Sequence, residues 1–333
     1  MDFEKWIELG VKKKASDLHL CSAHYPRLRI DGELQVLEGY SRVDEKEIKM
    51  LSQTLLTEPK YLQLAEKGQL DFAFTQNKQR LRGHFFKQQY GISAAFRFIP
   101  ESCPDFDVLN IPAIVQQLMR QENGLILITG ATGSGKSTTL NAVISAMNQR
   151  YARHIIILED PIEYLHRDGL GLIQQRDLSL HTCSANAALS AALRQDPDII
   201  LLSELRDLES IRLALTAAET GHLVLATLHT RTAAQAVDRL IDVFPAEDKS
   251  CVRGQLASSL IAVLAQKLVL KEGGGRIPLF EVLVRTPAVS HLIREGKIHQ
   301  LEDVMHRGSQ WGMQTFTQHK EQLQQEGSLA KNA

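Results

Sequence analysis

The chain has 333 residues, of which 44% are apolar and 23% are charged, and its formal net charge is −1. A chain of this length and composition is long enough for two globular domains with separate hydrophobic cores. The balanced charge argues against strong non-specific attraction to nucleic acid or anionic lipid, and no apolar run is long enough to cross a bilayer, because polar side chains interrupt the longest candidate at 256–270.

The N-terminal part alternates short helical and strand patterns. Apolar residues at helical spacing predict a helix that begins at Phe3 and ends near the lysine run at 12–14. Two strands are expected next, and the second is closed by Asp31 and Gly32, which is a hairpin signal. A helical region over 44–67 and three further strands complete an α+β domain. The five strands are expected at 17–20, 26–30, 70–74, 81–86 and 92–98.

The pattern changes after a polar stretch punctuated by prolines, which we interpret as a linker. The expected organisation is an N-terminal domain over 1–99, a linker over 100–112 and a second domain over 113–333 with a helical C-terminal region. Apolar strands alternate with helical segments in the second domain, which predicts an α/β fold with a parallel sheet covered on both faces. Its strands are expected at 124–129, 154–158, 198–202 and 223–227.

A complete phosphate-binding loop follows the first of these strands. Residues 130–137 match GxxxxGK[ST], and a helical segment at 138–147 follows, which is the context that the motif requires. The glycines allow successive backbone N–H groups to point inward and form an anion cradle for ATP. Lys136 is expected to reach the β- and γ-phosphates and Ser137 to ligate Mg²⁺. The predicted nucleotide-binding residues are Gly130, Ala131, Thr132, Gly133, Ser134, Gly135, Lys136, Ser137 and Thr138.

Acidic residues stand at the ends of two later strands. One strand runs into Glu159, Asp160 and Glu163, and the next runs into Glu204. Ligands of open α/β sheets bind beyond the carboxyl ends of the strands, so these carboxylates are expected to face the phosphates. One can hold Mg²⁺ through water and another can orient the attacking water. Each acid could instead cap the helix that follows it.

Two histidines bracket the last of the four strands, with His222 before it and His229 after it. A single histidine is usually structural. A pair at opposite ends of a buried strand could sense the state of the nucleotide or an adjacent subunit.

The cysteines and the N-terminus favour a cytoplasmic protein. The N-terminus lacks the basic-then-apolar order of a secretion signal. The cysteines form no CxxC pair, which predicts free thiols without a structural zinc site or a disulfide framework. They are Cys21, Cys103, Cys183 and Cys251.

Together these motifs resemble the type II/type IV secretion ATPase (GspE/PulE) superfamily, and most closely its PilT-like twitching-motility (type IV pilus retraction) ATPases. The resemblance covers nearly the whole chain. Its motifs are N-terminal-domain segments at 16–20 and 29–32, an aspartate box at 158–164, a Walker B segment at 193–207, a histidine box at 216–230 that includes His222 and His229, and a C-terminal signature at 312–315.

The resemblance implies a PAS-like N-terminal domain joined to a RecA-like P-loop ATPase domain, assembled as a homohexameric ring that uses ATP and Mg²⁺. Glu163 is expected to be the general base and Glu204 the Walker B acid that holds Mg²⁺ together with Ser137. The resemblance also implies that Arg82 and Arg97 reach nucleotide phosphate, although from the residues alone both would be surface charges on strands. An inner-membrane pilus platform protein, and no nucleic acid, is the implied partner of this cytoplasmic, peripheral protein.

Three parts of the chain depart from the family pattern. Ser203 precedes Glu204 where the family usually has glycine, and Gly83 and His84 follow Arg82. The C-terminal element Ala-Val-Ser-His-Leu-Ile-Arg-Glu at 288–295 replaces the arginine and asparagine of the retraction enzymes with Ser290 and His291. This element is associated with retraction rather than with ATP hydrolysis, so its departure bears on the pilus role.

Three alternative functions follow from the same residues. A type II secretion or pilus-assembly ATPase is disfavoured, because such relatives usually carry a tetracysteine zinc element and a longer N-terminus. A RecA-like nucleic-acid translocase would need a basic stripe with aromatic residues, whereas only 6% of this chain is aromatic. A nucleotide-binding regulator with little hydrolysis is disfavoured by the retained acids, but Ser203 keeps this alternative open, and measured ATP turnover decides it.

Overall fold

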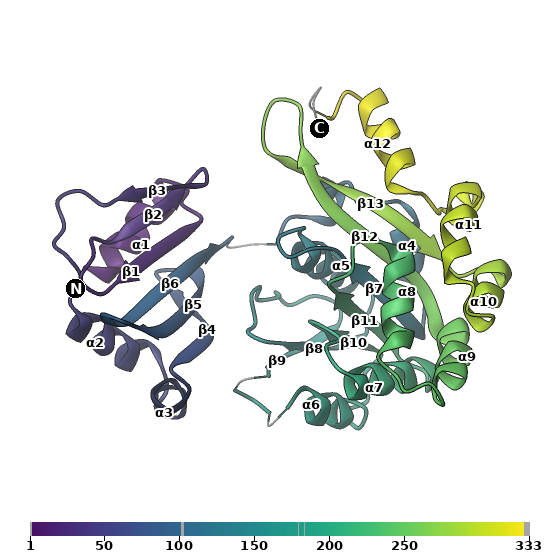
Figure 1. Ribbon diagram of the computed structural model, residues 1–333, viewed down its shortest axis with the longest axis horizontal. Coiled ribbons are helices and arrows are strands. Elements are labelled where there is room, and N and C mark those ends of the chain that lie inside the picture. The colour runs from purple at the N-terminus through teal and green to yellow at the C-terminus, as the bar shows by residue number, and fades with distance from the viewer. Residues whose placement is uncertain (1, 101–102, 179, 183, 330–333) are drawn as a thin grey trace. The chain divides into compact units, whose positions relative to one another are not determined.

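The computed structural model describes residues 2–100, 103–178, 180–182 and 184–329 (Figure 1). The chain divides into two compact units, one of 1–102 with 160–165 and the other of 103–159 with 166–333. The short segment 160–165, which follows a strand of the second unit, thus groups with the first unit. The domain boundaries expected at 99 and 113 stay a prediction, and residues 101–102 of the expected linker lie outside the described part.

An antiparallel sheet of six strands in the order β3-β2-β1-β6-β5-β4 forms the first unit. Its strands include all five that the sequence predicts, and the hairpin at Asp31 and Gly32 joins β2 to β3. The strands are β1 (Asp17–Cys21), β2 (Arg27–Ile30), β3 (Glu33–Val36), β4 (Gln69–Gln76), β5 (Gln79–Gln88) and β6 (Gly91–Ile99), and the helices are α1 (Phe3–Lys12), α2 (Glu45–Leu55) and α3 (Glu58–Lys67).

The helical region expected over 44–67 is two helices rather than one. Asp44 caps α2 through a hydrogen bond from the backbone N–H of Lys46, and α2 ends at Leu55. Pro59 stands in the first turn of α3, where a backbone N–H has no partner within the helix, so its absence costs little. In the interior of one long helix the same proline would remove a hydrogen bond and clash with the preceding turn. The proline therefore explains why the chain forms two helices here, although the apolar periodicity continues across both.

A seven-stranded sheet in the order β13-β12-β7-β11-β10-β8-β9 forms the second unit. All neighbouring strands are parallel except β13, which pairs antiparallel with β12, so the expected parallel sheet is a mixed one. Its strands are β7 (Gly124–Thr129), β8 (His154–Glu159), β9 (Leu172–Asp177), β10 (Ile199–Leu202), β11 (Leu223–Leu228), β12 (Leu260–Leu270) and β13 (Arg276–Val284).

Helices cover both faces of this sheet, as the sequence predicts (Figure 1). Successive side chains of a strand point to opposite faces. Leu125 and Leu127 of β7 therefore pack with helices α6 to α11, whereas Ile126 and Ile128 pack with α4 and α5. The helices are α4 (Ile114–Leu118), α5 (Lys136–Arg150), α6 (Ala185–Ala192), α7 (Leu208–Glu219), α8 (Ala233–Asp242), α9 (Lys249–Ser259), α10 (Pro287–Arg294), α11 (Leu301–Arg307) and α12 (Phe316–Gln325), and short 3₁₀ helices span Phe106–Leu109, Ile298–Gln300 and Ser309–Trp311.

Among the described residues, no helix has both the length and the apolar character that a membrane span needs. Cys21, Cys103 and Cys251 are free thiols, and burial raises the pKa of Cys103 to about 12. Cys183 lies outside the described residues.

Candidate active site

The phosphate loop connects the carboxyl end of β7 to the first turn of α5. Gly130, Gly133 and Gly135 have φ angles of +153°, +79° and +89°, a region that side chains rarely adopt. A Cβ at Gly130 would lie 2.3 Å from the carbonyl oxygen of Gln266, and one at Gly135 would lie 2.8 Å from its Nε2 atom. The glycines thus permit both the curled backbone and its close packing on β12.

Lys136 and Ser134 give the loop the character of an anion site. The Lys136 ammonium is buried and donates hydrogen bonds to the carbonyl oxygens of Gly130 and Ala131, at 2.7 and 3.0 Å. Burial lowers the pKa of Lys136, and the nearby Glu204 carboxylate opposes this shift. The Ser134 hydroxyl is buried without a hydrogen-bond partner among the described residues. A phosphate would supply acceptors for these donors and for the backbone N–H groups.

Ser137 and Glu204 offer oxygen ligands of the kind that Mg²⁺ prefers. Ser137 is exposed in the first turn of α5, and Glu204 follows β10. In the described part of the chain no three His, Cys, Asp or Glu residues gather closely enough to hold a metal unaided. Mg²⁺ does not need such a group, because it usually binds to one or two protein oxygens, to substrate phosphates and to water.

The structure brings together Glu204 and His229 but not His222. Glu204 Oε2 accepts a hydrogen bond of 2.8 Å from Arg206 Nε, and its Oε1 atom lies 3.3 Å from His229 Nε2. His222 precedes β11 at the far end, roughly 20 Å along the strand. Its Nδ1 atom lies 3.1 Å from the carbonyl oxygen of Ala217, which is a local contact. A nucleotide-sensing role for the pair stays a prediction.

The two acids after β8 differ in their surroundings. Glu159 is the last residue of β8 and is buried, with its Oε2 atom 3.5 Å from Gln175 Nε2. Glu163 belongs to the segment that groups with the first unit, where its Oε1 atom accepts a hydrogen bond of 3.2 Å from Arg82 Nη1. The predicted base is therefore paired with one of the two predicted phosphate-binding arginines.

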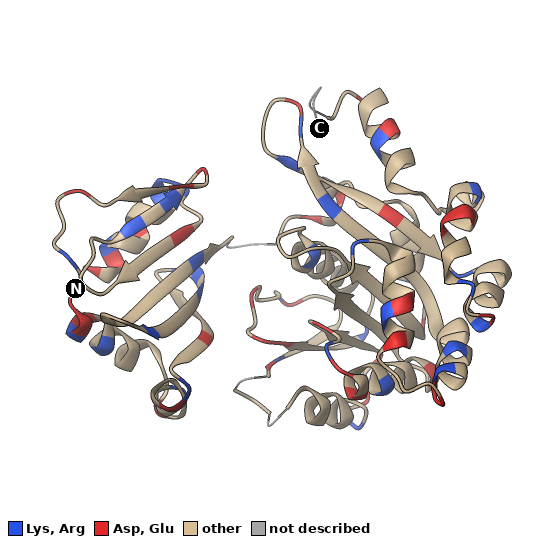
Figure 2. Cartoon of the chain, in the orientation of Figure 1, with Lys and Arg blue, Asp and Glu red and all other residues tan. Residues whose placement is uncertain are grey.

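Arg82 and Arg97 are cross-strand neighbours on β5 and β6, and blue segments mark Lys and Arg on this sheet in Figure 2. Directly opposed residues project from the same face of a sheet, so the two guanidinium groups share the face that lies away from the core. Arg97 Nε donates to Asp17 at 3.1 Å, and 67% of the Arg97 side chain is exposed. Asp71 lies 3.6 Å from Arg82. The acids offset the repulsion between the two cations.

Sequence reasoning missed Gln266, which supports the phosphate loop from β12. Its side chain is buried, donates from Nε2 to the carbonyl oxygen of Ser134 at 2.8 Å and accepts a bond of 2.8 Å from the Thr139 hydroxyl. The available signal was a polar residue inside an otherwise apolar run. Such a residue in a buried strand needs partners, and here the partners are the loop and α5.

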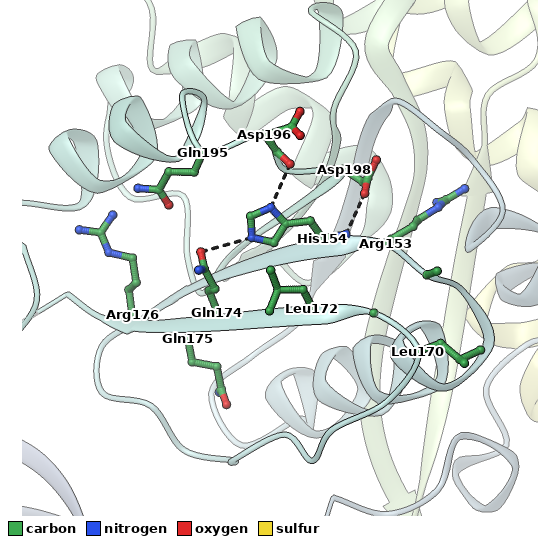
Figure 3. A pocket seen from close by; sticks show the side chains of 12 residues that line it. Arg153, His154, Leu170, Leu172, Gln174, Gln175, Arg176, Gln195, Asp196 and Asp198 are labelled. Atoms are coloured by element: carbon green, nitrogen blue, oxygen red, sulfur yellow. Dashed lines mark hydrogen bonds between the residues drawn. The ribbon is translucent and has the colours of Figure 1, made fainter.

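An open hollow of about 1130 Å³ lies beside the first residues of β8 and β9 (Figure 3). At its centre, His154 contacts Gln174 Oε1 and the carbonyl oxygen of Asp196, and its backbone N–H donates to Asp198 at 2.7 Å. These residues lie mainly at the amino ends of the strands, whereas the phosphate loop lies at the carboxyl ends. The hollow therefore lies mainly away from the phosphate loop, and Gln175 and Arg176 line it from the carboxyl half of β9.

The departures from the family pattern have clear local structures. Ser203 is held by its backbone, whose N–H donates to Leu158 and whose carbonyl accepts from the Thr227 hydroxyl. Ser290 is buried in α10 and donates to the carbonyl oxygen of Ala257 at 2.9 Å, while His291 is exposed.

Comparisons with known proteins agree with this architecture. The family described as "Type II/IV secretion system protein" matches residues 2–330. The uncharacterized protein YggR of Escherichia coli is 53% identical over 330 residues, which cover 99% of this chain and 100% of YggR. The type IV pilus retraction ATPase PilT of Pseudomonas aeruginosa is 41% identical over 317 residues, which cover 95% and 92% of the two chains.

Among solved structures, the crystal structure of the pilus retraction motor PilT with bound ADP has a TM-score of 0.91 and 38% identity, and the match covers 100% of this chain and 95% of that one. The similarity extends over both units, and the expected fold of a RecA-like ATPase domain with a smaller N-terminal domain is confirmed.

Proposed function

The chain belongs to the type II/IV secretion system protein family of P-loop ATPases, and from that premise we propose that it is a hexameric motor that converts ATP hydrolysis into movement between its two units. The observation that carries the proposal is the complete phosphate loop, with Lys136 buried against it and Glu204 beside it, in a chain similar to a pilus retraction motor over its whole length.

In this proposal the residues divide the work of binding and hydrolysis. Lys136 and the backbone N–H groups of the loop bind the phosphates, and Ser137 and Glu204 hold Mg²⁺. When bound, Mg²⁺ would supply positive charge beside the phosphate oxygens. Glu163 accepts a proton from the attacking water, and Arg82 and Arg97 stabilise the developing charge. Because Arg82 is hydrogen-bonded to Glu163 in this structure, it must exchange that partner before it grips a phosphate.

The proposed partners follow from the same family membership. Six copies would form a ring at the cytoplasmic side of the inner membrane, where a platform protein of a pilus apparatus would receive the movement. The phosphate loop and its acids support ATP hydrolysis. The pilus role rests on the similarity to the retraction ATPases and is tested separately.

The decisive experiment replaces Lys136 with Ala. Without the ammonium the β- and γ-phosphates lose their cationic partner, so ATP turnover is expected to fall to background. The measurement is phosphate release by purified protein. Near-normal turnover in Lys136→Ala would contradict the assignment of the site.

The pilus role is tested by complementation in a strain that lacks its own retraction motor. Twitching zones are expected with the wild-type chain and not with Lys136→Ala. An expressed, hydrolysing, hexameric protein that does not restore twitching would leave the ATPase assignment standing and remove the retraction role.

A further inference from the structure

Helix α5 carries two buried asparagines that bind the loop at 166–171. Asn141 and Asn148 are seven residues apart, about two helical turns, so both side chains lie on one face of the helix. Asn141 Oδ1 lies 2.8 Å from His166 Nε2, and Asn148 Nδ2 donates to the carbonyl oxygen of Arg167 at 3.0 Å. A buried asparagine is costly without partners, and these contacts satisfy the Asn141 side chain and the Nδ2 atom of Asn148.

The hydrogen bonds of Asn141 determine the tautomer of the His166 imidazole. Asn141 Nδ2 donates to the carbonyl oxygen of Ser137 at 2.9 Å, which leaves Oδ1 as the acceptor that faces the imidazole. His166 must therefore carry its proton on Nε2 and donate it to Asn141. Burial lowers the pKa of His166 to about 4, so the ring is neutral at physiological pH.

His166 is also bonded on its other side. Its backbone N–H donates to Gln175 Oε1 of β9 at 3.0 Å, and the Nε2 atom of the same Gln175 lies 3.5 Å from Glu159 Oε2 at the end of β8. The chain leaves β8 at Glu159, passes through Glu163 and meets α5 again at His166. A line of polar contacts thus runs from the first turn of α5 to Glu159, which precedes the segment that contains Glu163.

We propose that His166 is a positioning residue for ATP hydrolysis, which couples the start of the P-loop helix to the segment that carries Glu163. His166 does not touch the reacting atoms. It binds Asn141 of α5 at the residue where the chain leaves that segment, and Asn141 in turn binds the Ser137 carbonyl, so a displacement of the helix on nucleotide binding is passed along the chain to the proposed base. This inference rests on the proposed function of the site.

The test compares His166→Leu, which removes the donor, with His166→Gln, whose side-chain N–H can still reach an acceptor. His166→Leu is expected to lower kcat by about tenfold or more, because small displacements of catalytic groups cost large factors in rate. The dissociation constant for fluorescent ADP is expected to stay within about twofold, since the phosphate loop is intact. His166→Gln is expected to recover most of the lost kcat. The exposed His299, replaced by Leu, is the matched control.

A double-mutant cycle with Asn141→Leu isolates the contact. The double variant His166→Leu, Asn141→Leu is expected to be no slower than the slower single variant, because both changes remove the same interaction. Multiplicative losses would overturn the proposal, since the residues would then act independently. If His166→Leu does not fold, Asn141→Leu and His166→Gln carry the test through the same comparison of kcat with ADP affinity.

Two other results would overturn the inference. The first is a folded His166→Leu variant with wild-type kcat. The second is a result in which His166→Leu and His166→Gln both lose kcat in proportion to their loss of thermal stability. The contact would then only stabilise the fold. Failure of the proposed function looks different, because wild-type protein would then release no more phosphate than Lys136→Ala, and that result would end both proposals.

Discussion

The lowered pKa of His166 makes the stability of the second unit depend on pH. A histidine in the unfolded chain titrates near pH 6.5, whereas burial lowers the pKa of His166 to about 4. Between these values the unfolded chain binds more protons than the folded chain, so stability is lost as the pH falls through this window. The shift corresponds to at most about 3 kcal/mol.

Urea unfolding measures this effect. Between pH 7 and pH 4.5 the free energy of unfolding is expected to fall more steeply for the wild-type protein than for His166→Gln, which has no ring to protonate. The exposed His299, replaced by Gln, serves as the control. Identical pH dependence in the wild-type and His166→Gln proteins would show that the histidine is not held neutral by burial.

The carboxylates of Glu163 and Glu204 are expected to separate binding from chemistry. Glutamine at either position keeps the shape and removes the charge, so each variant should bind ATP and hydrolyse it about 10²–10⁴-fold more slowly. Fluorescent-nucleotide binding and phosphate release measure the two properties. If Glu163→Gln turned over normally, the base would lie elsewhere, and the buried Glu159 would be the next candidate.

At the scale of elements, β12 acts as the support of the phosphate loop through Gln266. Gln266→Leu would leave the Ser134 carbonyl and the Thr139 hydroxyl without this partner, at a cost of about 1–3 kcal/mol. We expect a lower unfolding temperature and weaker ADP binding, because the loop loses an anchor. Gln35→Leu on the exposed strand β3 is the control and should change neither property. Unchanged ADP affinity in a destabilised Gln266→Leu protein would limit the residue to a structural role.

The sequence predicted the elements whose pattern is strong and local. Strands β7, β8, β10 and β11 are apolar throughout or nearly so, and they lie where expected. Two of the missed strands, β9 and β12, have weaker signals. β9 is a polar edge strand, and β12 follows α9 without a loop, so its apolar run merges with the helix.

The side-chain partners in the site were harder to predict than the motifs. Both Glu204 and His229 follow strands of one sheet, but only the order of the strands decides that they meet. Asn141 and His166 are in contact, but neither residue belongs to a sequence motif that would link it to the other. Such pairs depend on the three-dimensional register and are invisible to spacing along the chain.

At the scale of the whole molecule, charges of both signs are interspersed along helices α8 to α11 (Figure 2). This distribution agrees with the net charge of −1 and gives no support to a continuous basic stripe for nucleic acid on these helices. Arg82 and Arg97 form a pair of neighbouring basic residues on β5 and β6.

These two arginines are expected to act on the nucleotide of a neighbouring copy, so ATPase activity per subunit should rise with protein concentration. Arginine fingers contribute about 10³–10⁵ in rate where they have been measured. Arg82→Ala and Arg97→Ala should therefore lose turnover while still assembling. Arg27→Ala, which changes an exposed arginine of β2 in the same sheet, is the control.

Mixing two inactive proteins decides whether the arginines act between subunits. Lys136→Ala cannot bind phosphate but retains Arg82, whereas Arg82→Ala retains the phosphate loop. If a finger reaches into a neighbouring subunit, mixed rings contain interfaces that join an intact loop to an intact arginine, and the mixture should hydrolyse ATP although neither protein does so alone. If the arginine serves the loop of its own chain, every site in the mixture lacks one group. A mixture that exchanges subunits and stays inactive would therefore contradict action between subunits.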